Sequence, residues 1–198
     1  MKKIFVLLLI FCGFPLFASE DAVKQVLKDM EKFQLEMNGS AMLELYHPAY
    51  VEIGLEGNKT AYSQIKDNMQ ELDAMRQVIM KATLPDASLL EIVSAVFVMN
   101  ESEITPELRE TINSLEDNAE GRKLAVESAK TLSEIHRIYL EAVRELWAGC
   151  EVVEVKVDKD AAQLFYRMKE SGAERVNEYT LELEKVNGKW LIKKSVCK

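Results

Sequence analysis

The sequence predicts an α+β fold, in which N-terminal helices pack on a curved antiparallel sheet of four to five strands and a helical block is inserted between them. In residues 20–37 and 60–80, apolar residues recur at every third or fourth position, which is the period of an amphipathic helix. The same period continues through residues 86–148. Over the last part of the chain the period changes to two, which is typical of strands with one buried face.

Residues 1–19 are expected to be a secretory signal peptide. Met1-Lys2-Lys3 is a short basic start, residues 4–11 are an unbroken apolar run, and small residues end the segment. This segment is too short for a permanent membrane anchor. Cleavage near Ala18 or Ser19 would place the protein in a bacterial periplasm or outside the cell.

The remaining residues, 20–198, are expected to form a single α+β domain with 86–148 as a helical insertion. The chain carries 25 Lys and Arg against 33 Asp and Glu, and loss of Lys2 and Lys3 leaves 23 against 33, a net charge of −10. An acidic surface repels phosphate backbones and anionic lipids. Nucleic acid is therefore not an expected partner, and neither is a membrane once the signal is cleaved.

The first predicted helix covers residues 20–37. Its apolar residues form one stripe at helical spacing: Ala22, Val23, Val26, Leu27, Met30, Phe33 and Met37. Asn38-Gly39 ends this helix, and Ser40 is the expected cap of a short second helix over residues 41–46.

A short strand is expected at residues 50–55, followed by a turn at Gly57-Asn58-Lys59. A third helix is expected over residues 60–80. Its inward-facing residues recur at helical spacing: Ile65, Met69, Leu72, Met75 and Val78.

The inserted block begins with a candidate helix over residues 86–99, although its end, residues 96–99, also fits a buried strand. Thr105-Pro106 is a helix start, with Thr as the cap and Pro in the first turn. Residues 118–148 form the longest predicted helix. A narrow packing seam runs along it: Ala125, Leu132, Ile135, Tyr139, Ala142 and Leu146. The seam either belongs to the core, or the block is a helical hairpin that forms a dimer or covers a pocket.

The last part of the chain is predicted to be a meander of four antiparallel strands. Apolar and polar residues alternate in each strand, and Asn187-Gly188 is a strong signal for a type I′ hairpin turn. This turn places Leu183 opposite Ile192 on one face. It places Glu182 opposite Lys193 on the other face.

Two cysteines, Cys150 and Cys197, follow the signal segment. An even count in an oxidising compartment suggests a disulfide. They lie at the same end of the first and fourth strands of the meander, so three spacings of roughly 4.8 Å separate them in a flat sheet. A disulfide needs Cα atoms within about 7 Å. Cys150 and Cys197 are thus a disulfide candidate that needs strong curling or another strand order.

A family resemblance rests on the predicted helices, the meander and two short segments. The segments are Leu45-Tyr46-His47-Pro48-Ala49-Tyr50-Val51-Glu52 and Val186-Asn187-Gly188-Lys189-Trp190-Leu191-Ile192. The chain resembles the nuclear-transport-factor-2-like superfamily, the cystatin-like cone shared with ketosteroid isomerase and polyketide-cyclase-like proteins. The resemblance covers roughly 20–80 and 150–197 and rests on a pattern of elements. It implies a conical, mostly apolar pocket that is open at one end.

The resemblance also implies where isomerase chemistry would lie. The family's aspartate base corresponds to Ile53, and its oxyanion-donating tyrosine corresponds to about Phe33. Ile53 cannot accept a proton and Phe33 cannot stabilise an enolate. The isomerase reaction is therefore not expected.

Six polar residues are candidates for lining a pocket: Tyr50, Glu52, Tyr62, His136, Tyr139 and Tyr166. Strand alternation places Glu52 on the face opposite to Val51 and Ile53, and the apolar pair is expected to face inward. Only two histidines occur and neither lies at ligand spacing from a second His or Cys, so no metal is expected. No cofactor motif occurs.

Three functions follow from this sequence. The first is an exported, non-catalytic domain that binds a small apolar ligand or serves as an accessory protein. The second is a small-substrate enzyme of the same fold that uses Glu52 or His136 as a base. The third is a protein-interaction module that forms a homodimer or pairs with another protein through its helical block.

Overall fold

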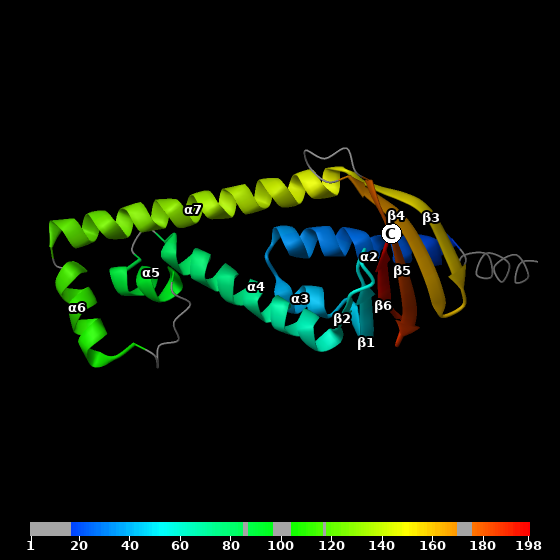
Figure 1. Ribbon diagram of the computed structural model, residues 1–198, viewed down its shortest axis with the longest axis horizontal. Helices are drawn as coiled ribbons and strands as arrows, with labels where there is room; N and C mark the ends of the chain where they lie inside the picture. Colours follow the sequence, from blue (N-terminus) through cyan, green and yellow to red (C-terminus); the bar gives the residue numbers. More distant parts are fainter. Residues whose placement is uncertain (1–16, 85–86, 97–103, 117, 170–175) are drawn as a thin grey trace, which may run out of the picture.

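The computed structural model describes residues 17–84, 87–96, 104–116, 118–169 and 176–198 (Figure 1). The expected signal peptide lies outside the described residues up to residue 16. The end of the candidate helix or strand at 97–99 also lies outside them. Within the described ranges, none of the helices combines the length and the apolar character needed to cross a membrane.

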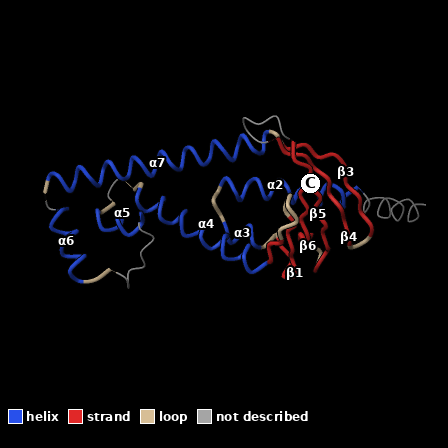
Figure 2. The backbone as a smooth tube through the Cα atoms, viewed as in Figure 1, coloured by secondary structure: helices blue, strands red, loops and turns tan. Residues whose placement is uncertain are grey.

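Six helices and six strands are assigned in these ranges (Figure 2). The helices are α2 (Phe17–Leu35), α3 (Gly39–Leu43), α4 (Tyr62–Ala82), α5 (Leu89–Val96), α6 (Pro106–Glu116) and α7 (Ala119–Ala148), with a gap in the description between α5 and α6. The strands are β1 (Tyr46–Ile53), β2 (Lys59–Ala61), β3 (Cys150–Asp158), β4 (Ala161–Lys169), β5 (Val176–Val186) and β6 (Lys189–Cys197).

The α+β class is confirmed, and the sheet has six strands in the order β2-β1-β6-β5-β4-β3. Strands β3 to β6 form the predicted antiparallel meander. Strand β1 lies beside β6 and runs parallel to it, which makes the sheet mixed. Strand β2, which the sequence did not predict, pairs with β1 over three residues and is too short to show an alternating pattern.

Strand β1 begins four residues earlier than predicted, at Tyr46. The backbone N–H of Ile192 donates to the carbonyl of Leu45 at 2.8 Å, so β6 already holds the chain at this point. His47 and Pro48 therefore lie within the strand instead of ending a helix. The register with β6 shifts between Tyr46 and Val51, which accommodates the missing N–H of Pro48.

The β5–β6 hairpin turns at Asn187 and Gly188, with φ angles of 51° and 83°, as a type I′ turn requires. Leu183 lies opposite Ile192, as predicted. The predicted pairing of Glu182 with Lys193 is wrong, because a register shift of one residue places Glu182 opposite Lys194.

The first hydrophobic cluster lies between α2 and one face of the sheet. Helix α2 contacts β3, β4 and β6 and runs into the curve of the sheet (Figure 1). Val23 of α2 is fully buried, and so are Leu164 of β4 and Ile192 of β6. We call this buried side of the sheet the inner face.

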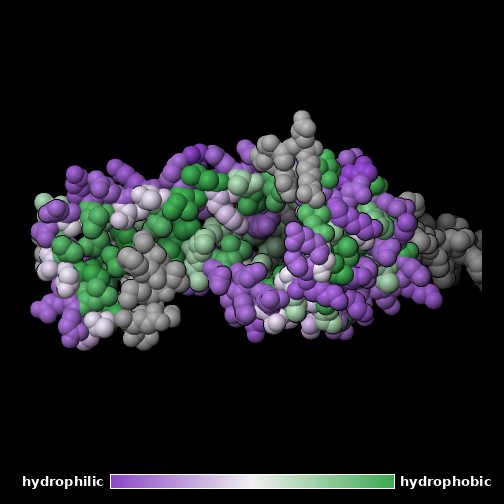
Figure 3. All heavy atoms as spheres, in the orientation of Figure 1, coloured by the Kyte–Doolittle hydropathy of each residue, from purple (hydrophilic) through white to green (hydrophobic). Residues whose placement is uncertain are grey.

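A second hydrophobic cluster lies at the opposite end of the molecule, where α5 contacts the C-terminal part of α4 and the N-terminal part of α7, and α6 contacts α5 and α7 (Figure 1). Its buried residues come from all four helices: Ala82, Leu89, Ile92, Ile112 and Ala125. We call this region the helical end. On the face drawn in Figure 3, hydrophobic side chains gather over this end, whereas hydrophilic side chains cover most of the sheet.

Helix α7 runs from the helical end to the sheet and joins the two clusters (Figure 1). The predicted packing seam is wrong at two positions, because Ile135 and Ala142 are exposed while Val143 is buried. A straight helix drifts by roughly 20° per heptad relative to a 3.5-residue seam. The buried line on α7 therefore moves away from the predicted seam, through Leu132 to Val143.

Candidate functional site

The inner face of the sheet brings together four tyrosines. The rings of Tyr46 and Tyr50 lie 4.7 Å apart in an edge-to-face arrangement. The rings of Tyr166 and Tyr179, which are opposite each other on β4 and β5, stack at 5.0 Å. Both kinds of geometry are favourable for aromatic pairs.

Glu52 shares the inner face with these tyrosines. It lies opposite Ser195 of β6, which is buried, and the hydroxyl of Tyr50 is hydrogen-bonded to that of Ser195. Tyr50 and Glu52 are two residues apart in the strand and so point to the same side. The expectation that Val51 and Ile53 would face inward is therefore wrong, because pairing with β6 orients β1 and the buried Tyr50 takes the inner position.

Burial raises the pKa values of the inner tyrosines. Desolvation, followed by the charge of Glu52, raises the pKa of Tyr46 to about 12. Burial also raises the pKa of Tyr50, with smaller contributions from Tyr46 and Glu52. For Tyr166, burial is again the largest cause, followed by Tyr179. These hydroxyls consequently stay protonated at neutral pH and can act as hydrogen-bond donors but not as bases.

The inner face is filled by its own side chains. Tyr50 is only 4% exposed, Tyr166 is 5% exposed, and α2 covers the centre of the face with Val23. The conical pocket implied by the family resemblance thus has little room next to these described residues. Glu52 itself is half-buried, at the edge of this packing.

The other predicted pocket residues lie at the edge of this group or apart from it. Tyr62, the first residue of α4, is half-buried and packs against the hydrophobic cluster that contains Tyr50 and Tyr166. The hydroxyl of Tyr139 donates to the backbone carbonyl of Gln34 at 3.1 Å, which ties α7 to the end of α2. His136 is half-buried on α7, three residues before Tyr139. Of the six candidates, the structure brings together Tyr50, Glu52 and Tyr166.

The two cysteines are free thiols in the structure. Cys150 begins β3 and Cys197 ends β6, and strands β4 and β5 lie between them. The Cys150–Cys197 disulfide candidate is therefore not formed. Burial, and then the charge of Glu31, raises the pKa of the Cys150 thiol, so it is less reactive than an ordinary cysteine.

One hollow of about 720 Å³ lies on the sheet at the β3–β4 turn. Seven of its twelve lining residues are charged: Lys156, Asp158, Lys159, Asp160, Glu182, Glu184 and Lys193. The Nζ of Lys193 lies 2.6 Å from a carboxylate oxygen of Glu184, so part of this charge is already paired. Such a surface suits water and ions better than an apolar ligand.

A second hollow of about 480 Å³ lies at the helical end, between α7 and the end of α4 with α5. We call it the helical groove. Its apolar lining comes from three helices and the α4–α5 connection: Ala82, Leu84, Ala87, Ile92, Ala125, Val126 and Ala129. Its polar lining comes mostly from α7: Thr83, Lys130, Ser133, Glu134 and Arg137.

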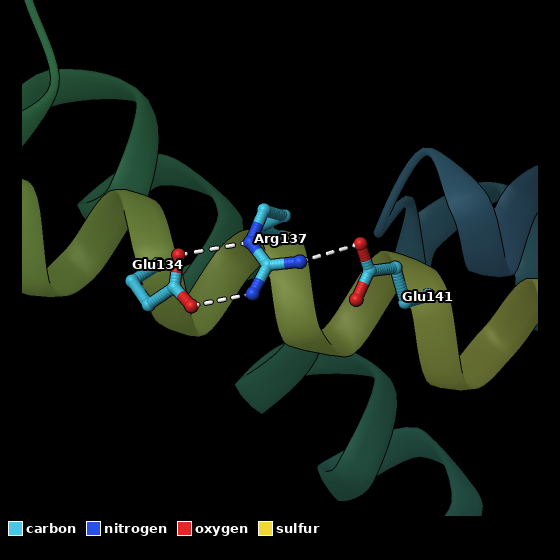
Figure 4. Close-up of polar contacts among 3 residues, drawn as sticks. All are labelled: Glu134, Arg137 and Glu141. Atoms are coloured by element: carbon cyan, nitrogen blue, oxygen red, sulfur yellow. Dashed lines mark hydrogen bonds and ion pairs between the residues drawn. The ribbon is translucent and has the colours of Figure 1, made fainter.

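The charges at the rim of the helical groove are arranged along α7 (Figure 4). The guanidinium of Arg137 donates to both carboxylate oxygens of Glu134, at 2.5 and 2.8 Å, and to Glu141 at 2.6 Å. These bonds hold the Arg137 side chain along the helix. Lys130 has no ion pair with any residue in the described ranges.

The sequence prediction missed the helical groove. Its α7 side is a row at four-residue spacing, formed by Ala125, Ala129, Ser133 and Arg137. Small residues at this spacing leave space on one side of a helix, which is a signal that could have been read from the chain. The positions of α4 and α5 that complete the groove could not.

Among the described residues, no three His, Cys, Asp or Glu side chains lie together in a group that could hold a metal ion. No family model matches the chain, and no curated protein matches it.

The chain is similar to several solved structures. One is an NTF-2 like protein of unknown function from Shewanella oneidensis MR-1, with 14% identity, 90% of this chain and 98% of that chain covered, and a TM-score of 0.43. An NTF-2 like protein of unknown function from Silicibacter pomeroyi DSS-3 has 11% identity, covers 91% and 95%, and has a TM-score of 0.44. A ketosteroid isomerase-like protein from Erwinia carotovora atroseptica has 10% identity, covers 93% and 95%, and has a TM-score of 0.38. Likeness at this level carries no argument about activity.

Proposed function

We propose that this protein is an exported, non-catalytic binding domain that holds a small apolar ligand in the helical groove. The observation that carries the proposal is the groove itself, a hollow of about 480 Å³ with a mainly apolar lining. Ligand pockets typically have volumes of roughly 300–1,000 Å³, apolar walls and a few polar groups. The hollow on the sheet is larger but is lined mostly by charged residues.

The polar rim suggests what else the ligand carries. Lys130 and Ser133 lie on the α7 side of the groove, beside its apolar lining. The Lys130 ammonium favours a ligand with one anionic group at the end of an apolar body. The Ser133 hydroxyl already donates to the carbonyl of Ala129, so towards a ligand it can only accept a hydrogen bond. Arg137 is already hydrogen-bonded to Glu134 and Glu141, so it contributes less to the binding of an anionic group.

A non-catalytic role is favoured by the chemistry of the two regions. The helical groove contains no cysteine, histidine or tyrosine in its lining. The inner face contains Glu52 and several tyrosines, but Tyr50 and Tyr166 are buried there. Binding without turnover is therefore the better-supported reading.

Native mass spectrometry tests the proposal on protein isolated from its own exported fraction. We expect the native protein to carry the added mass of a small molecule, which is lost on denaturation. We also expect the mass of the denatured polypeptide to match a chain that starts near Glu20. Ser133→Phe would fill the groove and should abolish the added mass. Thr131→Phe is the matched control, since both residues are exposed and both hydroxyls donate to the carbonyl four residues earlier, at 2.9 and 3.0 Å.

Three results would contradict the proposal. An added mass that persists in Ser133→Phe would place the ligand elsewhere, and wild-type protein without any added mass would argue against a retained ligand. A polypeptide that keeps residues 1–19 would argue against export by signal cleavage.

A second candidate function is catalysis on a small substrate with Glu52 as the base. The observation that favours it is the shared face of Glu52, Tyr50 and Tyr46, because the Glu52 charge raises the pKa of both tyrosines and must lie near them. Turnover of a carbonyl substrate that is lost in Glu52→Gln and retained in Ser133→Phe would support catalysis and displace the binding proposal.

A further inference from the structure

Helix α7 carries a seven-residue repeat of charge. Four consecutive units begin with glutamate and place a basic residue three positions later. The glutamates are Glu120, Glu127, Glu134 and Glu141, and the basic residues are Lys123, Lys130, Arg137 and Arg144. A strict seven-residue period on a helix is typical of coiled-coil helices.

A stripe without charged residues, exposed except for the half-buried Ser128, runs beside the glutamates. Its members are spaced by alternating steps of four and three: Leu124, Ser128, Thr131, Ile135, Ile138 and Ala142. Leu124 and Ile135 are each 50% exposed and Ile138 is 53% exposed. Thr131 donates its hydroxyl to the carbonyl of Glu127 at 3.0 Å, which leaves its methyl group to face outward. We call these six residues the α7 stripe.

The α7 stripe has the geometry of a coiled-coil seam that lacks its partner helix. Steps of four and three place all six residues along one line of a helix. At a rise of 1.5 Å per residue, the line from Leu124 to Ala142 is about 27 Å long. The glutamates then occupy the flanking position at one edge of the seam, where charged residues select a partner.

We propose that the α7 stripe binds an amphipathic helix of another protein, and that this helix presents Lys or Arg to the row of glutamates. The choice of a basic partner rests on charge complementarity with the row of glutamates. Arg137 engages both oxygens of Glu134 and one oxygen of Glu141, and Lys123 lies 4.0 Å from one oxygen of Glu127. Glu120, Glu127 and Glu141 each still have an oxygen that can accept a hydrogen bond from a partner. The net charge of −10 expected after signal cleavage also attracts a basic partner.

A second copy of this chain fits the α7 stripe less well. Antiparallel pairing of two α7 helices would place the glutamate rows beside each other, which is repulsive. Parallel pairing would place each glutamate row beside the opposite edge of the other stripe. That edge consists of uncharged residues that face the protein: Ala125, Leu132, Tyr139 and Leu146. A basic helix from a different protein satisfies the glutamates in either direction.

This inference is independent of the helical groove. On a helix with 3.6 residues per turn, Ser133 lies roughly 160° around the axis from Ile135, on the other side of α7. A variant that fills the groove should therefore leave the α7 stripe intact. A variant that alters the stripe should leave the groove intact.

The test uses the mature protein and two labelled peptide probes of about three heptads, a length that matches the stripe. Both probes carry Ile and Leu on one face, and they differ only in having Lys or Glu at the flanking positions. Fluorescence anisotropy should show saturable binding of the Lys probe, with an affinity at least about tenfold higher than that of the Glu probe.

Variants identify the surface. Ile135→Ser combined with Ile138→Ser should lower the affinity of the protein for the Lys probe by about tenfold or more. Val126→Ser is the matched control, since Val126 is a 54% exposed apolar residue of the same helix that lies off the stripe. Val126→Ser and Ser133→Phe should bind the probe as wild-type protein does.

Several outcomes would overturn the proposal. One is no binding of the Lys probe up to about 100 µM. Another is equal binding of both probes, and a third is unchanged affinity in the double serine variant. A dimer in sedimentation that the double serine variant abolishes would assign the stripe to a second copy instead.

Discussion

Gly121 is the position where the structure makes the sharpest prediction about stability. It lies buried in the first turn of α7, against the end of α6. A Cβ atom added there would lie 1.5 Å from the carbonyl oxygen of Leu115 and 2.2 Å from its carbonyl carbon. These are backbone atoms, so no side chain can rotate to make room. Gly121→Ala must therefore separate α6 from α7.

The magnitude follows from what that separation exposes. Ile112 of α6 is almost fully buried in the cluster at the helical end, and uncovering such a side chain costs about 1.5–3 kcal/mol. Alanine is a better helix former than glycine by about 1 kcal/mol, which acts in the opposite direction. The expected result is a net loss of about 0.5–2 kcal/mol in the free energy of unfolding.

Urea unfolding and amide hydrogen exchange measure this effect. Gly54→Ala is the matched control, because a Cβ there meets only the carbonyl oxygen of Asn58, at 3.9 Å. We expect Gly121→Ala to lower the urea midpoint and to speed exchange in α6, with little change in Gly54→Ala. If Gly121→Ala proved as stable as wild type with α6 still protected, the argument from close approach would be refuted.

Three further predictions concern the sheet and its neighbouring helix. Asp73→Ala should lose about 1–2 kcal/mol in urea unfolding, because the Asp73 carboxylate accepts from the N–H groups of Gly39 and Ser40 at 2.7 and 2.8 Å and so caps α3; an unchanged midpoint would refute this. Asn187→Ala should destabilise the β5–β6 hairpin by about 1 kcal/mol while Asn187→Gly should not, because φ is positive at this position and alanine is strained there. Equal urea midpoints for the two variants would contradict this. Raising the pH from about 10 to about 12 should destabilise the fold, because the unfolded tyrosines ionise near pH 10 while Tyr46 resists until about 12. Tyrosinate absorbance and circular dichroism should therefore change together. Ionisation of all tyrosines near pH 10 without unfolding would contradict the burial of this tyrosine cluster.

Much of the fold could be predicted from local sequence patterns. Asn187-Gly188 specifies a type I′ turn by itself, and the alternating residues around it then place Leu183 opposite Ile192. The start of α6 at Pro106 and the start of α7 after Asn118 also follow from neighbouring residues. These features depend on backbone preferences within a few residues.

The candidate sites were less predictable. The alternation around Glu52 shows only that it opposes Val51 and Ile53, not which side is buried. The choice is made by β6, which pairs with β1 and brings Ser195 against Tyr50. Likewise, the small residues on α7 become one wall of the helical groove only when α4 and α5 supply the other.

The sequence by itself therefore determined the type and order of most elements, the meander and its final hairpin, because each depends on residues close together in the chain. Only the tertiary structure decided that β1 joins β6 in parallel, that Glu52 faces the tyrosines, and which line of α7 is buried. The physical reason is that a strand or helix has several faces of similar composition. Which of them is buried depends on partners that lie far away in the chain.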